Sequence, residues 1–467
     1  MNTFVAEIVR GTGPVRATGI ADPSQGSWII GDVRLDARDE LRDALGVAGH
    51  TAPRDGADIE LAFAAWSAWG ERATDHLRGD FSFALWDSDR RTFFCARDAL
   101  GVRPLYWAEL GDHFICSNAL AGIRAHPRVT ARLNTRAIVS FLERGYNDDT
   151  STTSFADINR LAPAHQLVVR DDSRAGTPAR YWDFPVPEPL RLRNDAAYIE
   201  RFRDVLGHAV RDRLRGNNAG ILLSGGLDST SLAATARRVA PEVKLLAWTN
   251  DMGPSAPHDE VRLAKQVAAR LGLAHQVTLH RSATLSHLSE SGFRTPEPLD
   301  EPEWSGWRDQ LREISASTST LISGEDGDAL FRPPGLLTML RAWPAHEVIR
   351  RVIAYTISYR HHPHLGIWLT RRLNAPFMRL PRGAHPTRPD AVGYLSDPIW
   401  QSVLEIAQPS YTGVALDMVW PLLDTRVIDF VFSIPPVPWC QRKELIRQSF
   451  RGELPDEVLS RKKSPLH

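Results

Sequence analysis

Residues 219–230, AGILLSGGLDST, decide the fold of the second half of this chain. A short apolar run ends in Ser-Gly-Gly and gives way at once to a helical pattern, which predicts a strand, a tight turn and a helix. Glycines let a backbone approach an anion closely, and the N–H groups at a helix N-terminus bind it. The turn has no lysine, whereas a Walker loop needs one to hold the β- and γ-phosphates of a nucleotide.

Strands and helices alternate around this turn. The pattern predicts a helix capped by Asp195, then strands at 219–223, 243–249 and 274–279 and helices at 228–239 and 259–271. That order favours a parallel, doubly wound α/β sheet.

The first half of the chain is rich in short aromatic runs, which predict strands. They lie at 81–87, 92–98, 103–110 and 113–117, and helices are predicted at 59–77, broken at Gly70, and at 134–143, capped by Asn134. The proline-rich stretch YWDFPVPEPLRLRND (181–195) separates the two halves. We therefore predict a first domain over 1–184, a linker over 185–196 and a second domain over 197–467.

Composition excludes several classes of protein. A length of 467 residues favours two domains, and 56 basic against 56 acidic residues predicts no nucleic-acid or membrane-surface partner. The three cysteines are scattered, which argues against a disulfide framework or a zinc site and fits a reducing compartment. We find no signal-peptide pattern and no apolar run of roughly 18 residues, so a cytoplasmic location is expected.

The segment LLSGGLDSTS (222–231) resembles the pyrophosphate loop of the N-type ATP pyrophosphatases, and closely that of the asparagine synthetase family. In that family the loop holds the β,γ-pyrophosphate of ATP while a substrate carboxylate attacks the α-phosphorus, giving an acyl-adenylate. The resemblance implies ATP and Mg²⁺ as cofactors. It assigns nucleotide binding to Leu223, Ser224, Gly225, Gly226, Asp228 and Ser229, with Asp228 also a magnesium ligand.

A second segment, LISGEDGDALF (321–331), resembles the family's SGEGSDE segment. By that match Ser323 and Gly324 line the nucleotide, and Asp328 is the second magnesium ligand. Glu325 falls where the family places a general base or a residue that contacts the substrate. A solvated acidic loop is the alternative. Two distant acids at the carboxyl edge of one sheet make a better magnesium site than either alone.

A third segment, WPLLDTRVIDFVFSIP (420–435), resembles the family's PFLD segment, and a helix with a basic residue follows it. Lys443 falls at that residue, which in related synthetases stabilises the adenylate and the transition state of acyl transfer. A cation aimed at developing negative charge is usually the largest catalytic term. The alternative is a surface lysine beside Glu444.

Residues 77–107 resemble the N-terminal glutamine amidotransferase domain of asparagine synthetases, which implies an Ntn-hydrolase-like αββα fold. In that domain an N-terminal cysteine attacks glutamine. This sequence begins Met1-Asn2-Thr3, and its first cysteine, Cys95, is expected to be a core thiol, as is Cys116. We therefore expect a domain that keeps the fold and does not release ammonia from glutamine.

Within this glutaminase-dead branch the chain looks most like the lasso peptide macrolactam cyclases, with β-lactam synthetases as close relatives. The resemblance implies adenylation of an Asp or Glu side chain of a precursor peptide and ring closure by the peptide's own α-amine. The expected partners are the leader-processed core peptide and the leader-binding protein and leader peptidase of the same pathway. The alternatives are a β-lactam-forming amide synthetase, an ammonia-using asparagine synthetase and a non-enzymatic scaffold. Intact Ser224, Asp228, Asp328 and Lys443 count against the scaffold.

Overall fold

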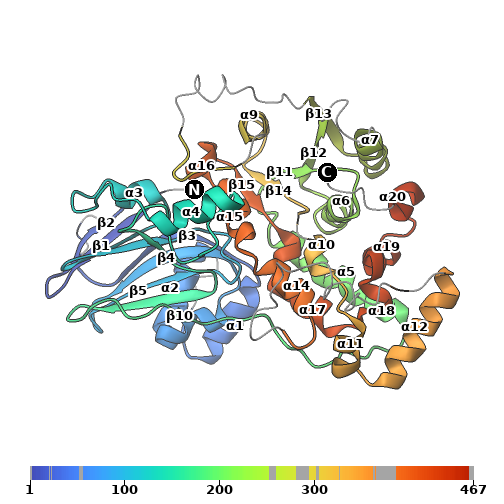
Figure 1. Cartoon of the computed structure of the whole chain (residues 1–467), viewed down its shortest axis with the longest axis horizontal. Coiled ribbons are helices and arrows are strands. Elements are labelled where there is room, and N and C mark those ends of the chain that lie inside the picture. Colours follow the sequence, from blue (N-terminus) through green and yellow to red (C-terminus); the bar gives the residue numbers. More distant parts are fainter. Residues whose placement is uncertain are drawn as a thin grey trace. The chain divides into compact units, whose positions relative to one another are not determined.

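The computed structural model describes residues 3–19, 22, 24–51, 56–251, 259–279, 294–300, 304–325, 327–360, 363 and 385–461. Its contacts divide the chain into two compact units, both discontinuous in sequence (Figure 1). The first unit comprises Met1–Asp183, Ala283–Arg308 and Pro398–Ala415, and the second comprises Phe184–Ser282, Asp309–Asp397 and Leu416–His467. Two segments of the first unit thus come from the stretch that the sequence analysis placed in 197–467.

The first unit holds two antiparallel sheets, with strand orders β2-β1-β7-β6-β8 and β10-β9-β5-β4-β3. Its strands are β1 (Val5–Val9), β2 (Gly13–Ala17), β3 (Trp28–Leu35), β4 (Gly79–Asp87), β5 (Thr92–Arg97), β6 (Tyr106–Leu110), β7 (His113–Ser117), β8 (Asn159–Arg160), β9 (His165–Arg170) and β10 (Ala179–Arg180). Its helices are α1 (Arg38–Val47), α2 (Asp58–Trp69), the 3₁₀ helix η1 (Gly70–His76), α3 (Leu120–Arg124), α4 (Thr135–Arg144), α15 (Pro398–Ile406) and α16 (Pro409–Thr412).

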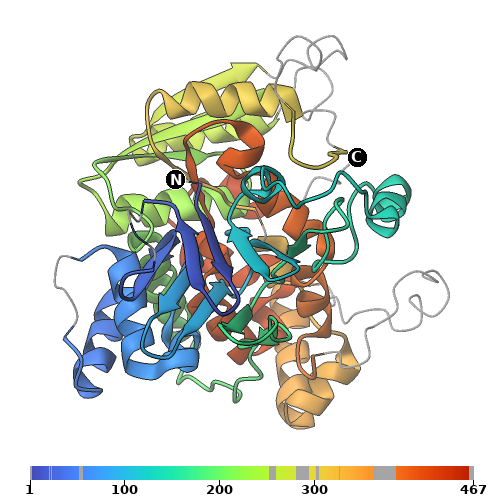
Figure 2. The same cartoon turned by 90° about the vertical axis from the view of Figure 1, so that its left-hand side faces the viewer.

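The sheets of the first unit stack between helices (Figure 1, Figure 2). Along β4, Phe81, Phe83 and Leu85 pack under α1 and α2, while Ala84 and Trp86 face the other sheet. Because side chains alternate between the two faces of a strand, a strand buried on both faces needs apolar residues throughout. With α3 packed on β6 and β7, the layers are α, β, β and α. The predicted αββα fold of this unit is confirmed.

A buried ion cluster holds the later segments within the first unit. Arg160 pairs with Glu297, and its Nε donates to Glu405 Oε1 over 3.1 Å. Both carboxylates are almost inaccessible to solvent. A buried charge is tolerated only when it is paired, so segments far apart in sequence must meet here.

The second unit has a five-stranded sheet in the order β13-β12-β11-β14-β15, and every pairing is parallel. Its strands are β11 (Asn218–Leu222), β12 (Lys244–Asp251), β13 (Ala274–Leu279), β14 (Thr320–Ile322) and β15 (Asp417–Val419). Its helices are α5 (Asp195–Arg211), α6 (Leu227–Val239), α7 (Asp259–Leu271), α10 (Gly327–Leu330), α11 (Leu336–Ala342), α12 (Ala345–Tyr359), α14 (Pro389–Leu395), η3 (Pro421–Leu423), α17 (Thr425–Ser433), α18 (Pro436–Trp439), η4 (Gln441–Lys443), α19 (Glu444–Ser449) and α20 (Asp456–Ser460). Helix α9 (Trp304–Ser315) crosses from the first unit's segment into the second's. The predicted parallel α/β sheet is confirmed.

One predicted helix cap is wrong. Asn194, not Asp195, caps α5, since the Asn194 side chain accepts a hydrogen bond from the N–H of Ala197. Asp195 is the first helical residue, where its negative charge still interacts favourably with the helix dipole. The predicted cap of α4 is confirmed, because Asn134 accepts a hydrogen bond from the N–H of Ala137.

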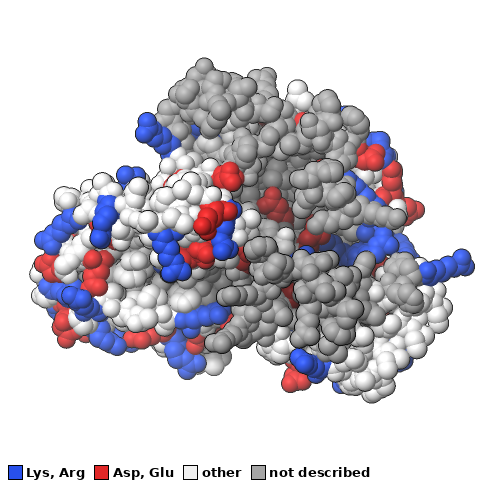
Figure 3. Space-filling model, in the orientation of Figure 1, with Lys and Arg blue, Asp and Glu red and all other residues white. Residues whose placement is uncertain are grey.

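The surface matches the balanced charge of the sequence. Figure 3 shows basic and acidic side chains interspersed over the described surface of one face, in keeping with 56 residues of each sign. Among the described residues, no helix combines the length and the apolar character that crossing a bilayer requires.

Candidate active site

The phosphate loop leaves β11 and enters α6 at the carboxyl edge of the parallel sheet (Figure 1). Gly225 has a φ of 66°, and a Cβ there would lie 2.8 Å from the Cβ of Leu263 and 2.9 Å from the Glu260 carbonyl oxygen. Both the left-handed conformation and the lack of space require glycine. The loop is therefore packed closely against α7.

Two serines and a threonine stiffen this loop. The hydroxyl oxygens of Ser224 and Ser229 lie 3.1 Å apart, and the N–H of Ser224 donates to Ser229 Oγ over 3.2 Å. Thr230 Oγ1 donates to the Gly226 carbonyl over 2.7 Å. The first turn of α6 thus carries hydroxyl groups beside its backbone N–H groups, an arrangement suited to the oxygens of a pyrophosphate.

The acidic loop follows β14, the neighbour of β11. The N–H of buried Ser323 donates to the Val419 carbonyl over 3.0 Å. A Cβ at Gly324 would lie 2.7 Å from the nitrogen of Ser229, and one at Gly327 would lie 2.4 Å from the carboxyl carbon of Asp228. These two glycines let the acidic loop touch the phosphate loop, so the segments predicted to share a site do lie together.

Lys443 joins both loops from a third segment. Its Nζ pairs with the carboxylate of Asp228 and lies 2.5 Å from Oδ1 of Asp328. The lysine side chain is 12% exposed, and Asp328 is 47% exposed, so the cluster is open to solvent on the Asp328 side. The three residues expected to carry the charge chemistry are thus gathered at one point.

The backbone that presents Lys443 is strained. Arg442 and Lys443 have φ values of 51° and 57°, the left-handed region that costs a residue with a side chain about 1–2 kcal/mol. Lys443 is also the N-cap of α19, where the helix dipole disfavours a cation. Strain of this kind persists only where the surroundings impose it, and it clusters at functional sites.

A hydrogen-bonded brace next to Lys443 supplies that constraint. Buried Glu444 accepts hydrogen bonds from the Tyr359 hydroxyl and, over 2.6 Å, from Gln448 Nε2. The Tyr359 ring stacks on Tyr355, with 4.5 Å between ring centroids. Burial, then the Glu444 carboxylate, raises the pKa of the Tyr359 phenol well above its usual value. The phenol therefore stays protonated as a donor and ties α12 to the turn that carries Lys443.

The donor set fits Mg²⁺. Carboxylates from two separate loops converge on one cation, and Gly327 leaves the space that the Asp228 carboxylate fills. Two carboxylates and one ammonium leave a net negative charge, and Mg²⁺ prefers carboxylate oxygens. Asp228 and Asp328 are the residues that would hold the ion, which would offset the charge of the nucleotide phosphates.

Leu223 and Glu325 are less directly placed. The N–H of Leu223 donates to the Trp248 carbonyl over 2.7 Å, and the Leu223 carbonyl accepts a hydrogen bond from the Thr249 hydroxyl over 2.5 Å. Leu223 therefore joins the phosphate loop to β12. Glu325 is exposed, with its N–H donating to Ser323 Oγ over 3.4 Å. The roles predicted for both remain predictions.

Asp424, the acid of the PFLD-like segment, has a structural place. It caps α17 and accepts hydrogen bonds from Arg213, at 2.7 Å, and from Arg426, at 2.8 Å. Burial opposes its ionisation, but the two guanidinium groups outweigh burial and lower the pKa of this carboxyl below its usual range. The sequence pattern gave no sign of this pairing, because Arg213 lies more than 200 residues earlier.

Cys95 and Cys116 are placed as predicted for core thiols. Cys95 and Cys116 are fully buried between the two sheets of the first unit, and Cys440 is buried in the second. Burial, followed by the neighbouring Cys95, raises the pKa of the Cys116 thiol well above its usual value. A nucleophilic cysteine needs an accessible, low-pKa thiol, and these thiols are buried.

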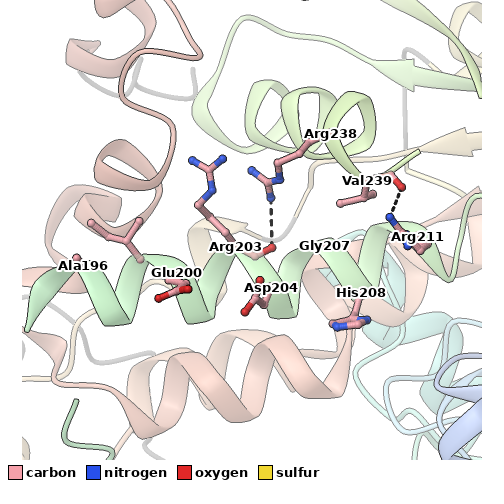
Figure 4. A pocket seen from close by; sticks show the side chains of 10 residues that line it. Ala196, Glu200, Arg203, Asp204, Gly207, His208, Arg211, Arg238 and Val239 are labelled. Atoms are coloured by element: carbon pink, nitrogen blue, oxygen red, sulfur yellow. Dashed lines mark hydrogen bonds between the residues drawn. The ribbon is translucent and has the colours of Figure 1, made fainter. Parts of the chain in front are cut away.

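A hollow of about 640 Å³ lies along α5 and the C-terminal end of α6 (Figure 4). Arg238 Nη2 donates to the Arg203 carbonyl over 3.2 Å, and Arg211 donates to the Val239 carbonyl over 2.5 Å. Val239 ends α6 and the phosphate loop begins it, so roughly 20 Å of helix separates the hollow from the candidate site. None of the predicted site residues lines it.

Both halves of the chain match known families. Residues 201–467 match the asparagine synthase model, and residues 35–182 match a glutamine amidotransferase domain. The chain is 26% identical to asparagine synthetase [glutamine-hydrolyzing] 3 of Bacillus subtilis (strain 168), over 99% of this chain and 78% of that protein. It is 27% identical to Amidase chry2 of Gibberella zeae over 62% of this chain, and there it spans only 46% of the relative.

Among solved structures, the NH3-dependent NAD synthetase from Campylobacter jejuni matches 29% of this chain and 58% of that one. The identity is 18% and the TM-score is 0.23, a likeness too distant to carry structural inference. The asparagine synthase match, in contrast, spans more than half of the sequence, including both loops and Lys443. The chain therefore belongs to the asparagine synthase family and is an asparagine synthetase-like, ATP-dependent amide ligase that uses ATP with Mg²⁺.

Proposed function

We propose that this chain closes a macrolactam, or isopeptide, ring on a lasso precursor peptide. The observation that carries the proposal is the meeting of Asp228, Asp328 and Lys443 at the phosphate loop, in a chain whose cysteines are all buried. The first feature equips the chain to activate a carboxylate. Because the three cysteines are buried, none is placed to attack glutamine. The attacking nitrogen must then come from another amine.

The chemistry would proceed in two steps. An oxygen of an Asp or Glu side chain of the peptide attacks the α-phosphorus of ATP, the bond between the α- and β-phosphates breaks, and pyrophosphate leaves. The peptide's N-terminal amine then attacks the acyl carbon, AMP leaves, and the amine's proton passes to a base. Ser224, Ser229 and the first turn of α6 would hold the departing pyrophosphate, and Glu325 is the candidate base.

Lys443 would serve the second step. Its ammonium lies beside Asp228 at the phosphate loop, where negative charge develops on the tetrahedral intermediate and on the leaving AMP. A preorganised cation there is worth roughly 100- to 1,000-fold in rate. The phosphate loop itself has no lysine. This is consistent with a loop that binds the leaving pyrophosphate and does not position a phosphate for transfer, while Lys443 supplies the positive charge.

The second candidate function is asparagine synthesis from aspartate and free ammonia. One observation favours it: the relative aligned over 99% of this chain carries the name asparagine synthetase. The activation step is the same for both candidates, and they differ in the nucleophile and in the size of the substrate. A β-lactam-forming synthetase would use the same activation on a small β-amino acid.

The test is amine-dependent release of AMP and pyrophosphate from ATP. Purified protein receives, in separate reactions, candidate core peptides with a free N-terminus, aspartate with ammonium, and a β-amino acid. We expect AMP, pyrophosphate and a peptide that has lost one water. Turnover of aspartate with ammonium alone would establish the second candidate, and formation of ADP would contradict the whole scheme.

The proposed partners follow from the peptide substrate. The core peptide must arrive with a free α-amine, so a peptidase that removes the leader would act before this chain, and a leader-binding protein would present the precursor to that peptidase. Co-purification of the chain with these two proteins, with and without core peptide, would test the assignment. We propose a cytoplasmic location for this assembly, where ATP is available.

A further inference from the structure

Glu7, His113 and His126 form a compact cluster in the first unit, whereas the residues of the candidate active site belong to the second. Glu7 lies in β1 and His113 begins β7, its antiparallel neighbour. Val9 is opposite His113 and Glu7 is opposite Ile115, so the Glu7 and His113 side chains lie diagonally on the same face of the sheet. Helix α3 packs on β6 and β7, and the chain leaving it brings His126 to the same place.

The distances within the cluster suit a metal ion. One ligand atom from each residue lies within 4.8 Å of the others. Oε1 of Glu7 lies 3.3 Å from Nε2 of His126 and 2.5 Å from Nδ1 of His113. Ligands at about 2.0–2.1 Å from a tetrahedral zinc ion are separated by roughly 3.3 Å from one another. One of the two contacts already has this spacing, and the other needs a shift of less than 1 Å.

Burial and donor type agree with the same ion. The side chains of Glu7 and His126 are each 8% exposed, so both are held by their surroundings. The side chain of His113 is 18% exposed, which leaves a path for an ion on its side of the cluster. Two histidines and one carboxylate are a common ligand set for zinc with a water as the fourth ligand. Calcium and magnesium prefer sites made only of oxygen ligands.

The surroundings of one histidine resemble those of a metal ligand. With Nδ1 of His113 facing Glu7, its Nε2 lies 3.7 Å from Oδ1 of Asp112, an oxygen that also accepts a 2.6 Å hydrogen bond from Arg128. A ligating histidine commonly donates its second N–H to a carboxylate, a backbone carbonyl or a water, and Asp112 is near enough to take this part after a small shift. His126 accepts a 3.3 Å hydrogen bond at Nδ1 from the N–H of Arg128. Metal at Nε2 would place a proton on Nδ1, so this long contact would open.

We propose that Glu7, His113 and His126 bind a divalent transition-metal ion of the zinc type, with water as the fourth ligand. The ion ties β1, β7 and the chain after α3 to one another. The site is independent of the proposed amide-forming activity. The three scattered cysteines predicted no zinc site, but this cluster contains no cysteine. Its ligands are His113, His126 and a glutamate that lies more than 100 residues before them.

The test uses Co²⁺ as the probe, because its visible absorption reports tetrahedral coordination. Untagged, chelator-treated full-length protein is titrated with Co²⁺ and then with Zn²⁺. We expect one equivalent of tetrahedral Co²⁺, displaced by Zn²⁺, and a higher melting temperature with Zn²⁺. His113→Gln and His126→Gln should each lose the absorption, and Asp112→Asn should bind roughly 10- to 100-fold more weakly.

Two variants control for other sites. Asp228→Asn removes a carboxylate of the candidate magnesium site, and His165→Gln removes a histidine of the same unit outside the cluster. Both should keep the Co²⁺ absorption, and circular dichroism should show every variant folded. The proposal is overturned if wild type gives no tetrahedral absorption, if His126→Gln binds as wild type does, or if Asp228→Asn removes the signal.

Discussion

Two charged side chains, one from each unit, are used in opposite ways. In the second unit, Lys443 sits in a strained turn, faces two acids and borders solvent. In the first unit, Arg97 is fully buried and donates to the carbonyls of Arg103, Leu161 and Gly101 at 2.7–2.9 Å. Arg97 is satisfied by backbone that the fold itself provides. Lys443 is held at an energetic cost in a place where a ligand could use it.

This difference bears on the two families that the chain matches, the glutamine amidotransferase domain and asparagine synthase. A strained, partly exposed cation beside paired acids is what activation of a carboxylate requires. Cysteines that are fully buried between two sheets act as small apolar residues of the core. The first unit has the αββα architecture of an amidotransferase domain, and Cys95 and Cys116 belong to its packed core.

The largest effect is expected from Asp228→Asn. Losing this carboxylate removes one predicted magnesium ligand and one partner of Lys443, so both adenylation and ring closure should fall, by roughly 100- to 1,000-fold or more. Pyrophosphate exchange into ATP measures the first step, and mass spectrometry of the peptide measures the second. The exposed Asp172 of the first unit provides the control, Asp172→Asn. Near-normal exchange in Asp228→Asn would contradict the predicted role.

Lys443→Ala should divide the two steps. The amide product should fall roughly 100- to 1,000-fold, because the cation that stabilises acyl transfer is gone, whereas pyrophosphate exchange should persist. The exposed Lys244 is the matched control, and Lys244→Ala should leave both rates unchanged. Equal loss of both steps would place Lys443 in adenylation instead.

Asp424→Asn should damage the second unit's stability without entering its chemistry. Removing the charge breaks the ion pairs that Asp424 makes with buried Arg213 and with Arg426, and breaking a buried ion pair by removing one partner costs about 3–5 kcal/mol. The lowered pKa of Asp424 means that its contribution is present above its unfolded pKa of about 3.9 and is lost as the pH falls toward the folded pKa. The free energy of unfolding, measured from pH 7 down to pH 3, should therefore decline in wild type and vary less in the variant. Parallel pH curves for the two proteins would refute the assignment.

Tyr359→Phe should have a moderate effect through Lys443. It removes a hydrogen bond that buried Glu444 accepts, so the turn that carries Lys443 is held less firmly. We expect the rate of amide formation to fall about tenfold, which corresponds to about 1.4 kcal/mol of transition-state free energy. Pyrophosphate exchange and the KM for ATP should change little, because Tyr359 does not contact the phosphate loop in the described structure. Glu444→Gln can still accept a hydrogen bond from Tyr359, so it should retain more activity than Tyr359→Phe. A uniform loss of stability with both steps equally slowed would indicate a purely structural role.

Local sequence patterns were enough to predict the elements that build the candidate site. The apolar run and glycines at 219–230 give β11, the phosphate loop and α6, because the turn needs a residue at positive φ and a close approach to α7. The pairing of Lys443 with Asp228 joins residues 215 positions apart. No local pattern contains that contact, and only the resemblance of three separate segments to one family brought these residues together.

The features that the sequence did not reveal depend on long-range burial. Glu297 and Glu405 are charged residues whose place in the first unit is decided by Arg160, which no pattern near them predicts. Strand β3 was not among the predicted strands, although it pairs with β4 along its whole length, from Trp28 opposite Trp86 to Leu35 opposite Gly79. The hydrogen bond between Tyr359 and Glu444 could not be predicted either, because α12 and α19 are distant in sequence and meet only in the folded chain.

The smallest effect is expected from the cysteines, and it bears directly on the difference between the units. Cys95→Ala and Cys116→Ala should each lower the free energy of unfolding by about 1 kcal/mol, the cost of removing a buried sulfur from a packed core. Neither should change amide formation, and neither wild type nor variants should release ammonia from glutamine. Because the raised pKa of the Cys116 thiol disfavours a thiolate, an alkylating reagent should label these residues only after unfolding. Ammonia release by wild type that Cys95→Ala abolishes would show that the first unit is a working glutaminase, and the proposed reliance on another amine would then fail.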